Sequence, residues 1–363
     1  MDRTIFLEAS DVWLFRDGRP FQAGQEHRAT SMFPPHPSVV YGALRTAGLL
    51  AENVVLGPNF SSPRFGSPEQ PGNFRFLGPV LSKDRKLLFP CPLDVVREKG
   101  EDHDEKRDPG KLHRLVPLRG IEARGDTGGF PFLHAPGTGE VEGIHEYLDA
   151  EGLAQWLEGK IPGRVIESEE IYGTEDRIGL ALDDPGGRRP HPGHLYIAGF
   201  IRPREGVELA GWVQGDGGLL GRSGNLRLGG DGHTARYEIL EKGPALPPPP
   251  AGPRKGAAIL LLTPALFGDE KGTTWKPEKF LKETGLTLVA AAVGRSLPVG
   301  GWDLVRDRPK PTRRAVPAGS VFFCHCEGPG SYQKAMDRHG TCISDLLPEA
   351  GFGLAAVGGW NHV

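Results

Sequence analysis

The stretch Thr30–Glu52, TSMFPPHPSVVYGALRTAGLLAE, decides how the N-terminal part of this chain folds. Its three closely spaced prolines keep the approach extended, because each proline disfavours helix in the residue before it. Ser38 then stands where a helix N-cap belongs, and the sequence predicts a helix that begins at Val39. The buried stripe of this helix follows helical spacing and comprises Val40, Leu44, Ala47 and Ala51.

A second face of the same helix is a candidate site for a phosphate. Its residues lie at positions i, i+3, i+4 and i+7, and they are Ser38, Tyr41, Gly42 and Arg45. A helix start offers free backbone amides, a glycine lets another backbone come close, and an arginine adds charge. An ordinary amphipathic helix with one exposed arginine fits the same pattern, and the residues alone favour this second interpretation.

Composition favours two domains with many shaped loops. The chain has 363 residues, of which 38% are hydrophobic, enough for two cores and too many for wholesale disorder. Its 53 glycines and 34 prolines are well above typical usage. Short regular elements joined by Gly/Pro-rich loops are therefore expected, and a helical bundle is excluded.

The charge distribution is uneven on a chain that is nearly neutral. A formal net charge of −3 excludes a generic polycation that coats nucleic acid. Acidic residues dominate Glu140–Asp184, whereas five basic residues face one acidic residue in Arg306–Arg314, RDRPKPTRR. A local basic patch fits a protein that binds RNA as part of an assembly, although charge runs are also typical of solvated loops.

The four cysteines in a chain of this length do not make a disulfide framework. No apolar run approaches the roughly 18 residues of a transmembrane helix, and the N-terminus MDRTIFLEAS lacks a signal-peptide core. We therefore expect a soluble, cytoplasmic protein without membrane contact.

One cysteine-rich segment permits a metal interpretation. Cys324 and Cys326 point to the same face if they lie on a strand, and His339 with Cys342 would complete a tetrahedral zinc site. The C-x-C spacing is less usual for zinc than C-x-x-C, and small buried cysteines are the favoured interpretation. We predict no metal and no cofactor.

The expected elements of the N-terminal half follow the order strand, helix, strand, strand, helix, strand. Their ranges are 4–15, a helix from residue 39, 74–80, 86–91, 149–158 and 194–201. This is the order of a ferredoxin-like, RRM-like unit. Glu167–Leu182 is left over and is predicted to be a projecting arm, with Ile171–Thr174 at its tip and Arg177 behind it.

A second RRM-like unit is expected after a boundary near residue 205, which gives domains at 1–205 and 206–363. Its strands are predicted at 207–214, 235–240, 257–263, 320–326 and 354–360, whereas 284–294 suits either a helix or a strand. The fold class is therefore α+β, with two ferredoxin-like units and long Gly/Pro-rich loops.

Ordered motifs along the chain carry a family resemblance. Trp13–Phe21, WLFRDGRPF, precedes the motif FPPHPSxxxGALRTA at Phe33–Ala47. Further motifs follow at Asp176–Leu180, Gly193–Tyr196, Leu228–Gly232, Leu262–Ala265, Gly300–Asp303 and Arg314–Val321. In this order they resemble the third RAMP subunit of Cmr complexes, the type III-B CRISPR effectors of antiviral defence.

The resemblance implies a non-catalytic, RNA-binding subunit. Such a subunit holds the 5′ tag of the crRNA and bridges the large polymerase- or cyclase-like Cmr subunit to the backbone RAMP subunits, with target RNA contacted indirectly. The arm would act as a wedge at the junction of tag and guide. The candidate RNA-binding residues are Arg19, His27, Arg28, His36, Ser38, Tyr41, Gly42, Arg45, Ile171, Tyr172, Arg177, Arg227, Gly229, Gly230, Arg313 and Arg314.

Two alternatives remain. Some RAMP proteins are guide-RNA-processing endoribonucleases that use a histidine as general base, and His27 and His36 lie in the corresponding region. Neither histidine has an acid or base partner fixed by short spacing, so RNA contact is the favoured role, a structural histidine comes second and catalysis third. A structural interaction subunit without RNA contact is the third possibility.

Overall fold

The computed structural model describes residues 3–16, 28–99, 110–118, 130–182, 190–303 and 306–360. The chain divides into two compact units, and each unit is assembled from three segments of sequence. The first comprises Met1–Arg85, Glu169–Gly243 and Pro298–Arg313, and the second comprises Lys86–Ser168, Pro244–Leu297 and Arg314–Val363. The units are therefore interleaved along the chain, whereas the sequence predicts one boundary near residue 205. Within the described ranges, no helix is long and apolar enough to cross a membrane.

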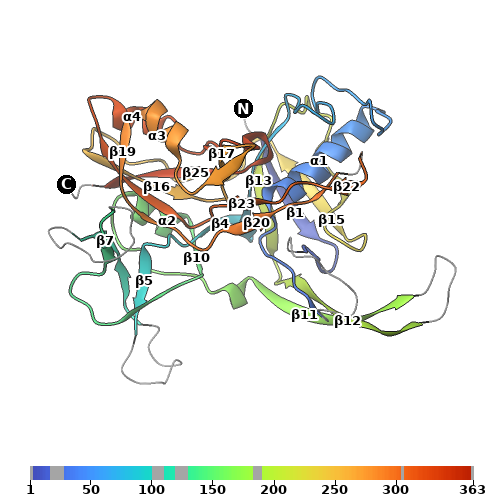
Figure 1. The fold of residues 1–363 in the computed structure, drawn as a ribbon, viewed down its shortest axis with the longest axis horizontal. Coiled ribbons are helices and arrows are strands. Elements are labelled where there is room, and N and C mark those ends of the chain that lie inside the picture. The colour runs from blue at the N-terminus through green and yellow to red at the C-terminus, as the bar shows by residue number, and fades with distance from the viewer. Residues whose placement is uncertain are drawn as a thin grey trace. The chain divides into compact units, whose positions relative to one another are not determined.

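A sheet with the strand order β3–β13–β1–β15–β14 forms the centre of the first unit (Figure 1). Its strands are β1 (Arg3–Ala9), β3 (Arg75–Lys83), β13 (Val207–Gln214), β14 (Ser223–Arg227) and β15 (Thr234–Leu240). Every neighbouring pair in this order is antiparallel. The helix α1 (Pro37–Ala51) lies between β1 and β3 in the chain and contacts β3 and β14, and its residues Val40 and Leu44 are fully buried.

The position of β13 differs from the sequence prediction. The pattern of Val207–Gln214 suggests a new unit, but the strand pairs with β1 on one side and β3 on the other. Seven of its eight residues are buried, as expected for a strand with neighbours on both edges. The helix predicted at 149–158 therefore belongs to the second unit and not to the first. The strand predicted at 194–201 pairs within a separate hairpin and not within this sheet.

A long antiparallel hairpin projects from the first unit. It pairs β11 (Tyr172–Leu182) with β12 (Pro190–Pro203), from Tyr172↔Pro203 at one end to Leu182↔Pro190 at the other. The short strand β2 (Arg28–Ala29) runs parallel to β12, and Trp13 forms an isolated bridge with Ile201. The hairpin contains both the predicted arm and the strand predicted at 194–201. Figure 1 shows it as a paired ribbon.

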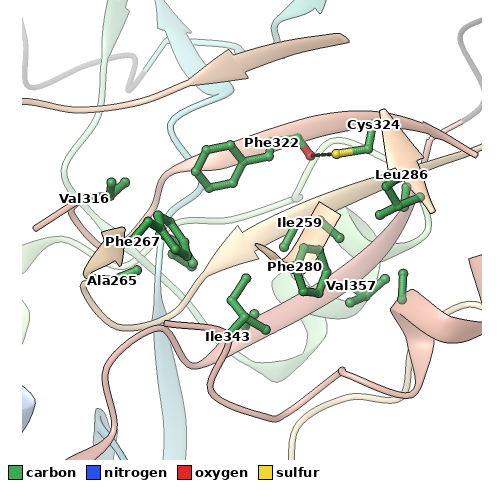
Figure 2. Packing of buried hydrophobic residues seen from close by; sticks show 14 of the residues in the cluster. Ile259, Ala265, Phe267, Phe280, Leu286, Val316, Phe322, Cys324, Ile343 and Val357 are labelled. Atoms are coloured by element: carbon green, nitrogen blue, oxygen red, sulfur yellow. Dashed lines mark hydrogen bonds between the residues drawn. The ribbon is translucent and has the colours of Figure 1, made fainter. Parts of the chain in front are cut away.

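The second unit has its own antiparallel sheet, in the order β19–β24–β16–β25. Its elements along the chain are β16 (Gly256–Leu261), α3 (Glu278–Thr284), β19 (Leu286–Ala292), β24 (Val321–Cys326), α4 (Ser331–Met336) and β25 (Ala355–Trp360). Ile259, Phe280, Phe322 and Val357 belong to the buried cluster that joins the helices to the sheet, as Figure 2 shows. The ambiguous segment 284–294 is thus a strand preceded by a short helix.

The helix α2 (Ala150–Leu157) of the second unit confirms its sequence prediction. Asp149 caps it, because the amide of Gly152 donates to the Asp149 side chain at 2.8 Å. Its apolar residues Leu153, Trp156 and Leu157 are fully buried.

Short elements complete the two units. They are β4 (Lys86–Pro90), β5 (Val95–Glu98), β6 (Leu112–Arg114), β7 (Val116–Pro117), β8 (Leu133–His134), β9 (Val141–Gly143), β10 (Tyr147–Leu148), η1 (Ser168–Glu170), β17 (Phe267–Asp269), β18 (Gly272–Thr274), β20 (Leu297–Val299), β21 (Trp302–Asp303), β22 (Arg308–Pro309), β23 (Arg313–Ala315) and η2 (Pro348–Ala350). The architecture is therefore mixed α and β, with mostly antiparallel strands and few helices.

Candidate nucleic-acid interface

The predicted phosphate-binding arginine of α1 is committed to contacts within the protein. Arg45 donates from Nε to the carbonyl of Phe65 at 2.5 Å and from Nη2 to the carbonyl of Ser67 at 2.6 Å. Its guanidinium also lies over the ring of Phe60, 5.3 Å from the centroid. These contacts fasten the loop after α1 to the helix, so the structure gives Arg45 a structural role.

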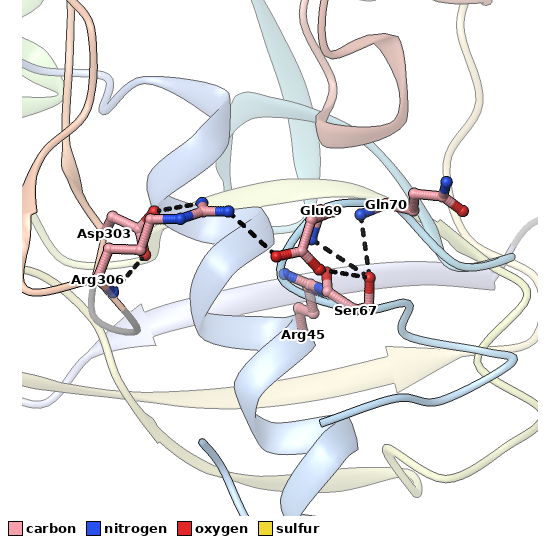
Figure 3. Close-up of polar contacts among 6 residues, drawn as sticks. All are labelled: Arg45, Ser67, Glu69, Gln70, Asp303 and Arg306. Carbon is pink, nitrogen blue, oxygen red and sulfur yellow. Dashed lines mark hydrogen bonds and ion pairs between the residues drawn. The ribbon is translucent and has the colours of Figure 1, made fainter. Parts of the chain in front are cut away.

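The loop after α1 also contacts the segment 298–313, which belongs to the same unit. Ser67 Oγ accepts from the amides of Glu69 and Gln70, at 3.3 and 3.2 Å. The Glu69 carboxylate pairs with Arg306 at 3.1 Å, and Arg306 also pairs with Asp303 at 3.0 Å. Figure 3 shows these contacts from Arg45 to Arg306. The hairpin of β21 and β22 is thereby connected to α1 through the loop.

The other residues of the predicted face have different environments. The helix begins at Pro37, and His36 occupies the N-cap position without a side-chain cap, so Ser38 is not the cap. Tyr41 is 9% exposed and stacks on Phe74, with centroids 5.5 Å apart. Beside Gly42, by contrast, no described atom lies within 4 Å of where a β-carbon would be. Among the four residues of the predicted face, Gly42 therefore has beside it the open space that another backbone would need to approach the helix.

His36 is half-buried and hydrogen-bonded rather than presented to solvent. Its Nε2 lies 3.2 Å from the carbonyl of Pro298, and a carbonyl can only accept, so Nε2 carries the proton. Nδ1 is buried and has no partner among the described residues. Burial lowers the pKa of His36 below its ordinary 6.5, which favours the neutral imidazole.

Three further candidates belong to the segment that precedes α1. Arg19 and His27 lie outside the described residues. Arg28 is described only by its backbone, which forms β2 with Ala29. Their assignment to RNA remains a prediction.

The predicted tip of the arm lies instead at the base of the hairpin. Ile171 is fully buried, and Tyr172, the first residue of β11, packs edge-on against Phe33 with centroids 4.9 Å apart. The prediction that Ile171–Thr174 forms the exposed tip is therefore wrong, because these residues begin the hairpin rather than connect its strands. The connection itself, at residues 183–189, lies outside the described ranges.

Arg177 belongs to a network of four charges near the hairpin base. Arg177 and Arg202 each pair with both Asp11 and Glu175, at distances of 2.5–3.0 Å. Hydrogen bonds from the two guanidinium groups lower the pKa of Asp11 and of Glu175. Arg177 also lies over the ring of Phe200 at 4.9 Å. The two carboxylates balance the two arginines, which reduces the attraction of this cluster for a phosphate.

The glycine-rich loop after β14 approaches the protein's own backbone. The amide of Gly230 donates to the carbonyl of Leu14 at 2.7 Å, and a β-carbon at Gly229 would lie 2.9 Å from the same oxygen. Gly229 also has a φ of +96°, which favours glycine. These glycines therefore serve local packing, whereas Arg227 at the end of β14 is exposed.

The four residues of the alternative zinc interpretation are not grouped as metal ligands. Cys324 belongs to the buried core cluster, and His339 accepts a hydrogen bond at Nδ1 from the amide of Val357 at 3.1 Å. Burial raises the pKa of Cys326, and raises that of Cys342 to about 12. In the part of the chain that the structure describes, no three His, Cys, Asp or Glu side chains are grouped as metal ligands.

The basic run 306–314 includes exposed cations, and it follows a tryptophan that the sequence analysis quoted within a family motif but did not list as a candidate site residue. Arg308 and Lys310 are exposed, Arg313 is half-buried, and Arg314 is exposed with Nη1 3.5 Å from Ser296 Oγ. Trp302, which precedes the run, is 52% exposed. The available signal was a tryptophan next to a cluster of basic residues.

Comparison with known proteins identifies the family. The family described as CRISPR-associated protein (Cas_Cmr3) matches residues 5–360. The chain therefore belongs to the Cas_Cmr3 family, the third RAMP subunit family of Cmr complexes that its motifs resemble.

Solved structures share its fold. A chain of the type III-B Cmr-beta complex bound to cognate target RNA and AMPPnP is 16% identical, with a TM-score of 0.53. A chain of Cmr-beta bound to cognate target RNA is 15% identical, with a TM-score of 0.51. Both matches cover 88% of this chain and 86% of the other. No curated protein matches the sequence.

Proposed function

We propose that this protein is a non-catalytic RNA-binding subunit of a type III-B CRISPR effector complex. In this role it holds the 5′ tag of the crRNA and bridges the large polymerase-like subunit to the backbone RAMP subunits. The observation that carries the proposal is the family match, which extends over residues 5–360 and thus includes segments of both compact units. The similar Cmr-beta chains come from complexes that contain target RNA.

The strand order of both sheets supports the proposed pair of ferredoxin-like units. Numbered along the chain, β16, β19, β24 and β25 form the sheet order 2-3-1-4, with α3 and α4 in the two crossovers. In the first unit, β1, β3, β13 and β15 form the same order, with α1 in the first crossover. The second crossover of the first unit contains β14 in place of a helix.

The environment of His36 supports a non-catalytic role. A general base must reach the proton that it abstracts. Nε2 of His36 is engaged by the Pro298 carbonyl, and Nδ1 is buried. Catalysis at His36 would therefore require this part of the protein to rearrange.

The exposed cations of the first unit are the proposed contacts with RNA phosphates. Arg227, Arg308 and Lys310 have no ion pair among the described residues, in contrast to Arg177 and Arg306. Open space beside Gly42 adds a place where a backbone can approach α1. These positions provide local charge on a chain whose net charge is −3.

The decisive experiment is to purify the assembled complex through a tag on this chain and to crosslink protein to RNA with ultraviolet light. We expect crosslinks from this chain to the 5′ tag of the crRNA. Their absence, in a complex that retains crRNA, would favour a structural interaction subunit.

The endoribonuclease alternative needs a separate assay. The isolated protein is incubated with labelled repeat RNA, and we expect the RNA to remain intact. Cleavage that follows the protein through purification and disappears in His27→Ala or His36→Ala would establish a guide-processing nuclease.

A further inference from the structure

The indole ring of Trp302 is exposed, and its single hydrogen-bond donor already has an acceptor within the protein. The residue lies on β21 and is 52% exposed. Its indole Nε1 donates to the carboxylate of Asp307 at 3.3 Å. A partner therefore gains little from hydrogen bonding to the indole, and the remaining accessible surface suits contact with another flat or apolar group.

The hairpin holds Trp302 in a defined position. The amide of Lys310 donates to the carbonyl of Gly301 at 2.9 Å, and Trp302 is paired with Pro309 across the ladder. The amide of Arg306 donates to Asp303 at 3.1 Å. A positioned aromatic side chain loses little conformational entropy when a ligand stacks on it.

The charges around Trp302 favour an anionic partner. The carboxylates of Asp303 and Asp307 are engaged by Arg306 and by the Trp302 indole, respectively. Arg308 and Lys310 follow within the same hairpin and are exposed. Arg308 and Lys310 flank Pro309, the residue opposite Trp302, so the hairpin carries an aromatic ring on one face and cations beside it on the other. With its acids engaged, this hairpin can stack on a nucleobase and place charges near the phosphates on either side of that base. A protein partner that docked through an apolar face would leave these cations without counter-charges.

We propose that Trp302 is a stacking platform for one base of single-stranded RNA, and that Arg308 and Lys310 contact the neighbouring phosphates. This inference rests on the proposed RNA-binding function and adds to it a specific base contact in the segment 298–313. Stacking on a tryptophan tolerates any base, because every base has a π face. The platform thus contributes affinity and position rather than sequence recognition.

The test measures binding of a fluorescein-labelled, 12-nucleotide single-stranded RNA to the purified full-length chain by fluorescence anisotropy. Trp302→Ala is expected to weaken binding about 5- to 150-fold, the range typical of one lost base stack. Trp302→Phe, which retains a ring, is expected to recover most of the affinity. The matched control is Trp275→Ala, which removes another partly exposed tryptophan (37%) and should leave the affinity unchanged.

Salt dependence separates stacking from charge. Trp302→Ala should preserve the slope of log affinity against log salt concentration, because a stack releases no counterion. Arg308→Ala and Lys310→Ala should each reduce the magnitude of that slope by about 0.7, the value for one phosphate contact on a single strand.

Three outcomes would overturn the inference. If the wild-type chain binds the RNA and Trp302→Ala binds it equally, the stacking platform is wrong while the proposed function stands. If Trp302→Ala keeps RNA affinity but no longer co-purifies with its complex, the residue docks a protein subunit. If the wild-type chain binds the RNA neither alone nor within its assembled complex, the proposed function fails, and this inference fails with it.

Discussion

The ring of Phe65 packs directly onto Gly48 of α1, in the space that a side chain at position 48 would occupy. A β-carbon built on Gly48 would lie 2.1 Å from Cζ of Phe65, closer than non-bonded atoms can approach. Phe65 is fully buried, and its carbonyl accepts the hydrogen bond from Arg45. Gly48 thus allows the loop after α1 to lie flat against the helix.

Gly48→Ala is therefore expected to destabilise the protein by about 1–3 kcal/mol, the usual cost of overpacking a core. The better helix propensity of alanine offsets up to about 1 kcal/mol of this. The matched control is Gly42→Ala. The described structure leaves open space there, so the same gain in helix propensity should leave the free energy of unfolding unchanged or raise it. Urea denaturation of the full chain measures both, and equal midpoints for the two variants would contradict the proposed packing.

Arg45→Ala is expected to lower the free energy of unfolding by about 2 kcal/mol, because hydrogen bonds from a charged group are worth roughly 1.5–3 kcal/mol. The carbonyls of Phe65 and Ser67 would each lose a donor. Arg227→Ala removes an exposed arginine and should leave stability within about 0.5 kcal/mol of wild type. If Arg45→Ala instead weakens RNA binding at unchanged stability, the original assignment of Arg45 to a phosphate is correct.

The charge network near the hairpin base should contribute to stability in a pH-dependent way. The pKa values of Asp11 and Glu175 are lowered in the folded protein, chiefly by hydrogen bonds from Arg177 and Arg202. A lowered pKa means that the contribution is fully present above the unfolded values, near 4, and is lost as the pH falls through the folded values. The urea midpoints of wild type and Asp11→Asn should therefore differ at pH 7 and converge at low pH. A difference that persists when the carboxylates are protonated would exclude the ion pairs as its cause.

Asp94 of the second unit should be among the most sensitive polar positions. Its side chain is fully buried, pairs with Arg114 at 2.6 Å and accepts from the indole of Trp156 at 2.8 Å. Asp94→Ala leaves the largely buried guanidinium of Arg114 without its carboxylate, and breaking such a pair typically costs about 3–5 kcal/mol. The exposed Glu278→Ala is the control, with little change expected. A loss at Asp94 below about 1 kcal/mol would show that water replaces the carboxylate.

The sequence by itself determined the local elements and the family. The helices α1 and α2 were predictable because apolar spacing, an N-cap at Asp149 and prolines ahead of α1 act within a few residues. Most strands were also predictable from alternation or from apolar runs. The ordered motifs identified the family because they depend on sequence order and not on contacts.

Only the tertiary structure decided which strands are neighbours and which candidate residues are available to a ligand. Thr4 pairs with Trp212, a partner that no local pattern specifies, and this pairing places β13 in the first unit. The same holds for the candidate site. Arg45 and Arg177 carry the charge that RNA requires, but the first donates to a backbone carbonyl and the second pairs with carboxylates of the protein. Whether a charged side chain faces solvent or an internal partner depends on residues distant in sequence, and these become neighbours only when the chain folds.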